Sequence, residues 1–171
     1  MSRIDYIEAK IVTPEVAKRN IGIWKMREEE IVFTNGCFDI LHRGHVTYLA
    51  KAANLGKRLI VAINSDESVR EQNKGPERPI NDEYSRQILI ASLGFVDQVI
   101  LFNKQTPLEL IEYLTPDILV KGADYDANET DPTSKKYIVG SDYVLKNGGK
   151  VSVIELEDGF STTNLVKKLK A

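Results

Sequence analysis

Residues 31–45 have the sequence IVFTNGCFDILHRGH, and this stretch decides the fold class. Its first four residues, 31–34, begin with three consecutive apolar side chains, which is typical of a short strand buried in a parallel sheet. Apolar residues at helical spacing then predict a helix over 44–55. The chain has two histidines, His42 and His45, and both follow the strand directly. The stretch therefore predicts a strand, a polar turn and a helix, with both imidazoles at the helix start.

The rest of the chain repeats this alternation. Further apolar runs predict four more strands, at 59–63, 96–102, 117–121 and 151–156. Helical patterns predict helices at 82–93, 106–114 and 139–146, and from Ser161 onward. Strands that alternate with helices form parallel sheets with right-handed crossovers. We therefore expect an α/β fold, a Rossmann-like three-layer sandwich with a five-stranded parallel sheet, whose ligand lies at the carboxyl ends of the strands.

Several polar residues at the strand ends have capping patterns. Asn64, with Glu67 three residues on, is predicted to cap a short helix. Thr106 and Glu109 form a second such pair, with Pro107 in the first turn. We therefore assign Asn64 and Thr106 to helix capping.

The first 28 residues are predicted to be an N-terminal helical extension to one domain over 29–171. Thr13 is a suitable N-cap and Pro14 a suitable first helical residue, so a helix is predicted from there to about Arg27. No residue of this segment has an evident chemical role. We expect it to serve in packing or in dimerisation.

Composition excludes several classes of protein. The chain has 171 residues, 42% hydrophobic and 28% charged, as in an ordinary globular domain. A net charge of −2 and a pI of about 5.8 argue against a nucleic-acid-binding surface. No apolar segment is long enough to span a membrane, and residues 1–10 do not have the pattern of a signal peptide. Because the single Cys37 cannot form an internal disulfide, a reducing, cytoplasmic location is expected.

The two histidines indicate phosphate chemistry. A helix N-terminus carries free N–H groups and a positive partial charge, which favour anions. Two imidazoles three residues apart, such as His42 and His45, can share one face of that helix and donate hydrogen bonds to phosphate oxygens. The alternatives are two ordinary helix-start histidines, or two metal ligands. A metal is disfavoured because no nearby Cys or Glu completes a site.

Two polar turns are further candidates for ligand binding, the second of them for anions. The turn over 34–38 contains Gly36, where a backbone without Cβ can approach a ligand closely. Neither a dinucleotide-binding nor a Walker glycine pattern is present. We interpret Cys37 as a packing residue and not as a nucleophile. The second turn, 161–163, offers three hydroxyls at a helix start, where simple capping explains only one.

The cations differ in what their positions predict. Lys74 and Arg78 lie in a polar loop, 71–80, that is a candidate for mobility, and Arg86 lies in the helix that follows it. Solvent-exposed charge is the default for all three. Lys121 ends an apolar strand just before Gly122, and there a ligand is the better explanation. Residues 124–128 mimic the start of a calcium-binding loop, but the glycine and glutamate that such a loop needs are absent.

Taken together, residues 34–45 and 161–163 resemble the cytidylyltransferase-like branch of the HIGH-motif nucleotidyltransferases. Segments 61–66, 78–81, 106–107 with 110–111, 120–125 and 157–163 are most similar to the adenylyltransferases that make ADP-heptose from D-glycero-D-manno-heptose 1-phosphate. The resemblance covers residues 31–169, so that the domain over 29–171 is identified as a nucleotidyltransferase domain. A departure is the segment 126–137, which has the character of an insertion.

The resemblance implies transfer of AMP from ATP to a sugar 1-phosphate, with release of pyrophosphate. It implies Mg²⁺ bound mainly through the nucleotide phosphates, with no protein side chain assigned as metal ligand. It also implies a separate sugar kinase that supplies the substrate, no nucleic acid and no membrane, with a homodimer left open. The implied catalytic residues are His42, His45 and Arg86. The implied nucleotide-binding residues are Thr34, Asn35, Gly36, Cys37, Phe38, His42, Gly44, His45, Lys74, Gly122, Ser161, Thr162 and Thr163. The implied substrate-binding residues are Asp39, Lys121 and Asp124.

Two alternatives remain open at this stage. One is a cytidylyltransferase for glycerol 3-phosphate or another alcohol phosphate. Relatives of that specificity carry an arginine in the run before Ser-Thr-Thr, and residues 155–160 contain none. The other is a nucleotide-binding sensor without turnover, which the presence of His42, His45 and Arg86 disfavours.

Overall fold

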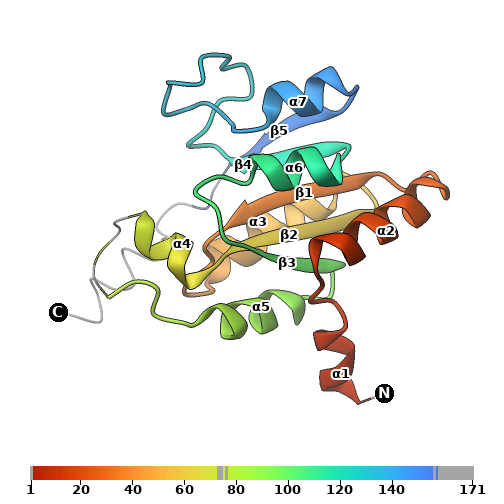
Figure 1. The fold of residues 1–171 in the computed structure, drawn as a ribbon, viewed down its shortest axis with the longest axis vertical. Coiled ribbons are helices and arrows are strands. Elements are labelled where there is room, and N and C mark those ends of the chain that lie inside the picture. The colour runs from red at the N-terminus through yellow and green to blue at the C-terminus, as the bar shows by residue number, and fades with distance from the viewer. Residues whose placement is uncertain (1, 73–74, 76, 156, 158–171) are drawn as a thin grey trace.

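Five parallel strands form the sheet at the centre of the computed structural model, which describes residues 2–72, 75, 77–155 and 157 (Figure 1). They are β1 (Ile31–Gly36), β2 (Arg58–Asn64), β3 (Gln98–Phe102), β4 (Ile118–Gly122) and β5 (Lys150–Ile154). Their spatial order is β3-β2-β1-β4-β5. The chain therefore builds outward from β1 to β3 and then crosses back to β4, which makes the gap between β1 and β4 the topological switch point.

Helices cover both faces of the sheet, as predicted for a three-layer sandwich (Figure 1). One face is covered by α3 (Arg43–Ala53) and α5 (Glu83–Ala91), and the other by α2 (Pro14–Lys25), α6 (Leu108–Leu114) and α7 (Ser141–Lys146). Successive side chains of β1 point to opposite faces of the sheet, so that Val32 packs with the first group of helices and Ile31 and Phe33 pack with the second. Two buried clusters, one on each face, thus share a single sheet.

The N-terminal segment is helical, as predicted, but α2 is part of the sandwich and not an appendage. Ala17 and Ile21 of α2 are buried in the same cluster as Phe33. A first helix, α1 (Arg3–Glu8), was not predicted, because a segment of six residues is too short to establish a helical period. Between the two helices the chain follows the edge of β3, where Val12 N–H donates to the Val99 carbonyl at 3.0 Å.

The capping expectations at two strand ends are wrong. The N-cap of α4 (Asp66–Glu71) is Ser65, whose hydroxyl accepts the Ser68 N–H at 3.1 Å. The helix α6 begins after Pro107 and has no side-chain cap. Neither Asn64 nor Thr106 is therefore the N-cap of a helix, contrary to the prediction. The helix predicted to begin at Ser161 lies outside the described residues.

Candidate functional site

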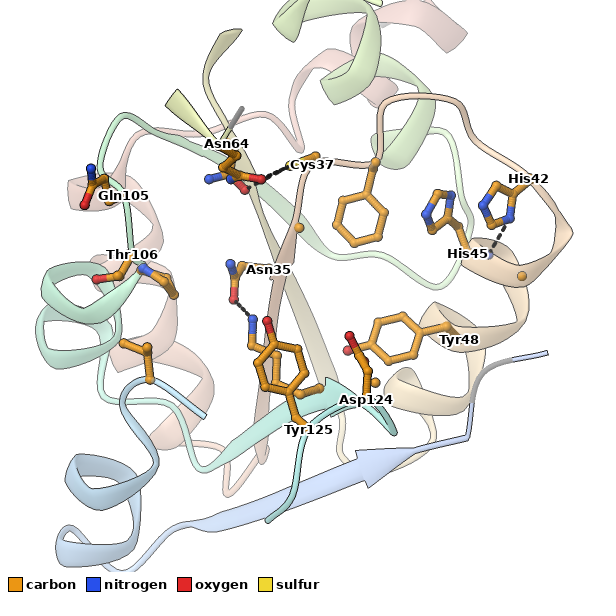
Figure 2. A pocket seen from close by; sticks show the side chains of 18 of the residues that line it. Asn35, Cys37, His42, His45, Tyr48, Asn64, Gln105, Thr106, Asp124 and Tyr125 are labelled. Carbon is orange, nitrogen blue, oxygen red and sulfur yellow. Dashed lines mark hydrogen bonds between the residues drawn. The ribbon is translucent and has the colours of Figure 1, made fainter. Parts of the chain in front are cut away.

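A cavity of about 730 Å³ opens at the carboxyl ends of the strands, across the switch point (Figure 2). The turn after β1 and the start of α3 form one wall, and the end of β4 forms another. The structure brings together on this cavity most of the residues predicted from sequence. These are Asn35, Gly36, Cys37, Phe38, His42, Gly44, His45, Lys121, Gly122 and Asp124.

The two histidines lie ring to ring at one end of the cavity (Figure 2). Their ring centroids are 3.8 Å apart with an interplanar angle of 18°. His42 is the N-cap of α3, and its Nδ1 accepts the His45 N–H at 3.4 Å. The pair is thus fixed at the helix N-terminus, where the free N–H groups and the helix dipole favour an anion.

Both imidazoles are held neutral at pH 7. Burial, followed by the nearness of His42, lowers the pKa of His45 to about 4. Burial also lowers the pKa of His42. The Nδ1 atom of His45 is buried and has no hydrogen-bond partner among the described residues. A buried polar atom without a partner is costly, so a ligand that satisfies it would gain affinity.

The Phe38 ring packs against His45, the inner member of the histidine pair. Its ring centroid is 5.3 Å from that of His45, in an edge-on arrangement at 70°. Phe38 has φ +48°, a backbone conformation that L-residues seldom adopt and that clusters at functional sites. Gly36 leaves room for this turn, since a Cβ there would lie 3.0 Å from Phe38 Cε2. The turn therefore depends on glycine at one position and tolerates strain at another.

Lys121 places a cation on the floor of the cavity, as its position at the end of β4 predicts. Its Nζ donates to Asn35 Oδ1 at 2.5 Å and lies 5.4 Å from the centre of the Tyr125 ring. Burial lowers the pKa of Lys121 to about 8, and the charge of Asp124 opposes this shift. The ammonium is therefore charged at pH 7 but incompletely compensated, and a phosphate would compensate it.

Three predicted site residues lie behind the cavity wall and do not line it. The Thr34 hydroxyl is buried, 2.7 Å from the Tyr48 hydroxyl. Asp39 is buried and accepts hydrogen bonds from Ile80 N–H and Asn81 N–H. The Arg86 side chain is 0% exposed and bonds protein groups. Lys74, Ser161, Thr162 and Thr163 lie outside the described residues.

Several residues on the cavity wall had no predicted role in the site. Asn64 and Gln105 could have been found from the rule that ligands meet strand ends, since one ends β2 and the other follows β3 (Figure 2). Tyr48 is one turn beyond His45 on α3. Glu157 begins the segment 157–163 that carries part of the resemblance, but no role was assigned to it. For Val139 there was no local signal. The residues missed are Tyr48, Asn64, Gln72, Gln105, Thr106, Pro107, Tyr125, Val139 and Glu157.

The described part of the chain contains no group of three or more His, Cys, Asp or Glu side chains arranged to hold a metal ion. Asp124 and Glu157 lie on the cavity wall, and Glu157 is ion-paired with Arg43 at 2.7 Å. This donor set suits a cation that arrives with its own phosphate ligands better than one held by the protein.

Comparison with known proteins assigns the family. The model of the family described as "Cytidylyltransferase-like" matches residues 33–168. The chain belongs to the cytidylyltransferase-like family. The match begins in β1 and includes residues 34–45, which we call the histidine turn because they contain His42 and His45.

Curated relatives in the cytidylyltransferase-like family carry the name "Bifunctional protein HldE". That of Magnetococcus marinus is 48% identical over 162 residues, which cover 95% of this chain and 31% of the relative. That of Pectobacterium carotovorum is 49% identical, covering 94% of this chain and 32% of the relative. That of Campylobacter jejuni subsp. doylei is 47% identical, covering 99% and 33%. The chain thus spans about a third of the length of the curated relatives it matches.

Solved structures share the fold of this chain. The lipopolysaccharide core biosynthesis protein from Thermoplasma volcanium is 31% identical, with a TM-score of 0.57, and the match covers 75% of this chain and 97% of that one. The pantoate-β-alanine ligase of Francisella tularensis is 13% identical with a TM-score of 0.54, covers 94% and 76%, and shares the fold alone. Among the described residues no helix is long and apolar enough to cross a membrane.

Proposed function

We propose that this chain transfers AMP from ATP to D-glycero-D-manno-heptose 1-phosphate, releasing pyrophosphate. The observation that carries the proposal is the pair of stacked, neutral imidazoles at the N-terminus of α3, in the same cavity as the buried cation of Lys121. Such a cavity offers two separate attractions for anions. A reaction between two phosphate compounds needs that arrangement.

The chemistry needs positioning and charge stabilisation more than proton transfer. A phosphate monoester has a second pKa near 6, so the sugar 1-phosphate is already ionised at neutral pH. One of its oxygens attacks the α-phosphorus of ATP, a new P–O bond forms, and the bond to the β-phosphate oxygen breaks. Pyrophosphate leaves with the electron pair of that bond. No general base is required, and catalysis comes from placement and electrostatics, as in other phosphoryl transfers.

The residues of the cavity divide this work between them. His42 and His45, with the N–H groups of α3, stabilise the charge that develops on the α-phosphate and the departing pyrophosphate. Lys121 binds the acceptor phosphate beside Asn35. When bound, Mg²⁺ would be held mainly through the nucleotide phosphates and would supply neutralisation of part of their charge.

The names of the relatives support the choice of acceptor. The similar Thermoplasma protein is named for lipopolysaccharide core biosynthesis, and the HldE relatives are called bifunctional. A sugar 1-phosphate substrate requires a kinase to make it. That activity fits the part of the bifunctional relatives that this chain does not match, or a separate enzyme. A cytoplasmic location and a homodimer stay predictions.

A pyrophosphate-release panel tests the proposal. Each of the four nucleoside triphosphates is combined, with Mg²⁺ or with EDTA, with heptose 1-phosphate, glycerol 3-phosphate or phosphoethanolamine. Pyrophosphate is expected with ATP and heptose 1-phosphate, and EDTA should abolish it. Turnover of CTP with an alcohol phosphate would replace the proposal with an alcohol-phosphate cytidylyltransferase. ATP binding without pyrophosphate release from any acceptor would favour a sensor.

A further inference from the structure

Arg86 is a fully buried cation that does not reach the cavity. Its guanidinium joins three segments: Nη1 donates to the Cys37 carbonyl at 2.7 Å, Nη2 to Asp66 Oδ1 at 2.7 Å, and Nε to the Asn81 carbonyl at 3.1 Å. The Cys37 carbonyl belongs to the peptide that precedes Phe38. Arg86 therefore fixes the plane of the peptide on the N-terminal side of Phe38.

Asp39 is held just as firmly on the other side of Phe38. Its carboxylate accepts the N–H groups of Ile80 at 2.8 Å and Asn81 at 3.0 Å, and it is ion-paired with Arg78. The Asn81 side chain donates to the Asp39 carbonyl at 2.5 Å. Phe38 is thus gripped from both sides by the segment 78–86, and we call Asp39, Asn81 and Arg86 the clamp.

The clamp accounts for the strained conformation of Phe38. A φ of +48° costs free energy in a bulky residue and persists only where the surroundings impose it. In this conformation the ring rests edge-on against His45, 5.3 Å away. Arg86 is thus connected to His45 through the Cys37 carbonyl and the Phe38 ring.

We infer that Arg86 is a positioning residue, which holds the Cys37–Phe38 turn so that the Phe38 ring keeps the His42–His45 pair stacked and buried. The inference rests on the proposed function only in taking this pair as catalytic. It replaces the expectation that Arg86 is itself a catalytic residue. A planar guanidinium suits the task because one rigid group reaches three acceptors at once, which a lysine ammonium does not do.

The chain's two histidines make the inference measurable without substrate. An NMR titration of the full chain should show the resonances of two imidazoles, which the variant His42→Gln assigns. Arg86→Lys should lose the hydrogen bond to the Cys37 carbonyl, so that the Phe38 ring packs less closely on His45. The pKa of His45 should then rise by about one unit from its low native value. In the same variant, kcat should fall about tenfold or more while KM for ATP changes less than about threefold.

Phe38→Leu is the second variant, and it removes no charge. It acts downstream of the clamp and should raise the pKa of His45 in the same direction. It also keeps the test open if Arg86→Lys fails to fold. The double variant Arg86→Lys with Phe38→Leu should raise the pKa of His45 no further than the larger of the two single variants does, because both act through the Phe38 ring.

Arg58→Lys is the matched control. Arg58 begins β2 at the other end of the sheet and, like Arg86, joins separate segments through its guanidinium, here through the carboxylates of Glu29 at 2.6 Å and Asp97 at 2.9 Å. Its replacement should leave both histidine titrations unchanged. A shift of His45 in this control as large as in Arg86→Lys would overturn the inference.

Two further results would overturn the inference. One is a folded Arg86→Lys or Phe38→Leu variant with native histidine pKa values. The other is an Arg86→Lys variant with a raised KM for ATP and native kcat, which would mean that Arg86 meets the nucleotide directly. Absence of pyrophosphate release from ATP and heptose 1-phosphate would contradict the proposed function but not the positioning role of Arg86, because the histidine titrations need no turnover.

Discussion

At the residue scale, burial sets the charge state of the two groups that matter most. It lowers the pKa of His45 to about 4 and that of Lys121 to about 8, in both cases because the charged form is poorly solvated. Both groups would therefore be stabilised in their charged forms by an incoming phosphate. At pH 7 the imidazole of His45 is therefore neutral, and Lys121 carries the positive charge on the cavity floor.

His45→Ala tests the catalytic role of the pair. Removal of a donor that acts mainly in the transition state should lower kcat by about 100-fold or more, and KM for ATP should change much less. Lys51→Ala, an exposed position on the same helix, is the control and should retain native kcat. Steady-state pyrophosphate release measures both. A His45→Ala enzyme with near-native kcat would contradict the assignment.

His45 also predicts how stability depends on pH. Between about pH 6.5 and 4 the unfolded chain binds a proton at this position and the folded chain does not, so stability falls as the pH falls through that window. From pH 7 to pH 5 the native chain should lose about 2 kcal/mol more stability than His45→Gln, which cannot titrate. Urea unfolding at the two pH values measures the difference. Equal losses in both proteins would mean that His45 is not held neutral.

At the scale of the elements, α2 shows how a segment without chemistry supports the site. Ile21 is 2% exposed and packs in the cluster that includes Phe33 of β1, whose carboxyl end carries the Cys37–Phe38 turn. Loss of α2 would uncover one face of that strand. The helix thus stabilises the sheet from the side opposite α3.

Ile21→Ala and Ile23→Ala form a matched pair on α2. Ile21→Ala should cost about 2–4 kcal/mol, because it removes buried methyl groups and leaves a cavity. Ile23 is 45% exposed, so Ile23→Ala should cost below about 0.5 kcal/mol. The free energies of unfolding in urea compare them. Similar costs for the two would show that α2 does not pack on the sheet as described.

At the scale of the whole molecule, two core clusters share one sheet and the cavity spans the switch point of that sheet. Unfolding should therefore be one cooperative transition, and a ligand in the cavity should stabilise the entire domain. Mg²⁺ and ATP at about 100 times the dissociation constant should add about 2.7 kcal/mol to the free energy of unfolding. Urea titrations followed by fluorescence of Trp24 in α2 and by circular dichroism should shift together. If ATP raised the unfolding midpoint measured by circular dichroism but not the midpoint measured by Trp24 fluorescence, the domain would not unfold as a single cooperative unit.

The sequence supported the fold and the histidine turn, because both depend on neighbouring residues. The apolar run of β1 and the helical period of α3 are local patterns, and so is the position of His42 and His45 between them. Asn64 and Thr106 were misread because the residue types that cap helices are also those that bind ligands. Arg86 was misread because a charged residue inside a helix is exposed by default, and nothing nearby in the sequence indicates that it is buried.

The sequence by itself determined the order of strands and helices, the face that each strand side chain takes, and the chemical groups at the strand ends. Only the tertiary structure decided which of these groups share a cavity, which are buried behind its wall, and which are neutral at pH 7. The physical reason is the distance along the chain over which each effect acts. Periodicity and propensity act over a few residues, whereas burial, desolvation and the clamp on Phe38 depend on segments that lie more than 40 residues apart, as Cys37 and Arg86 do.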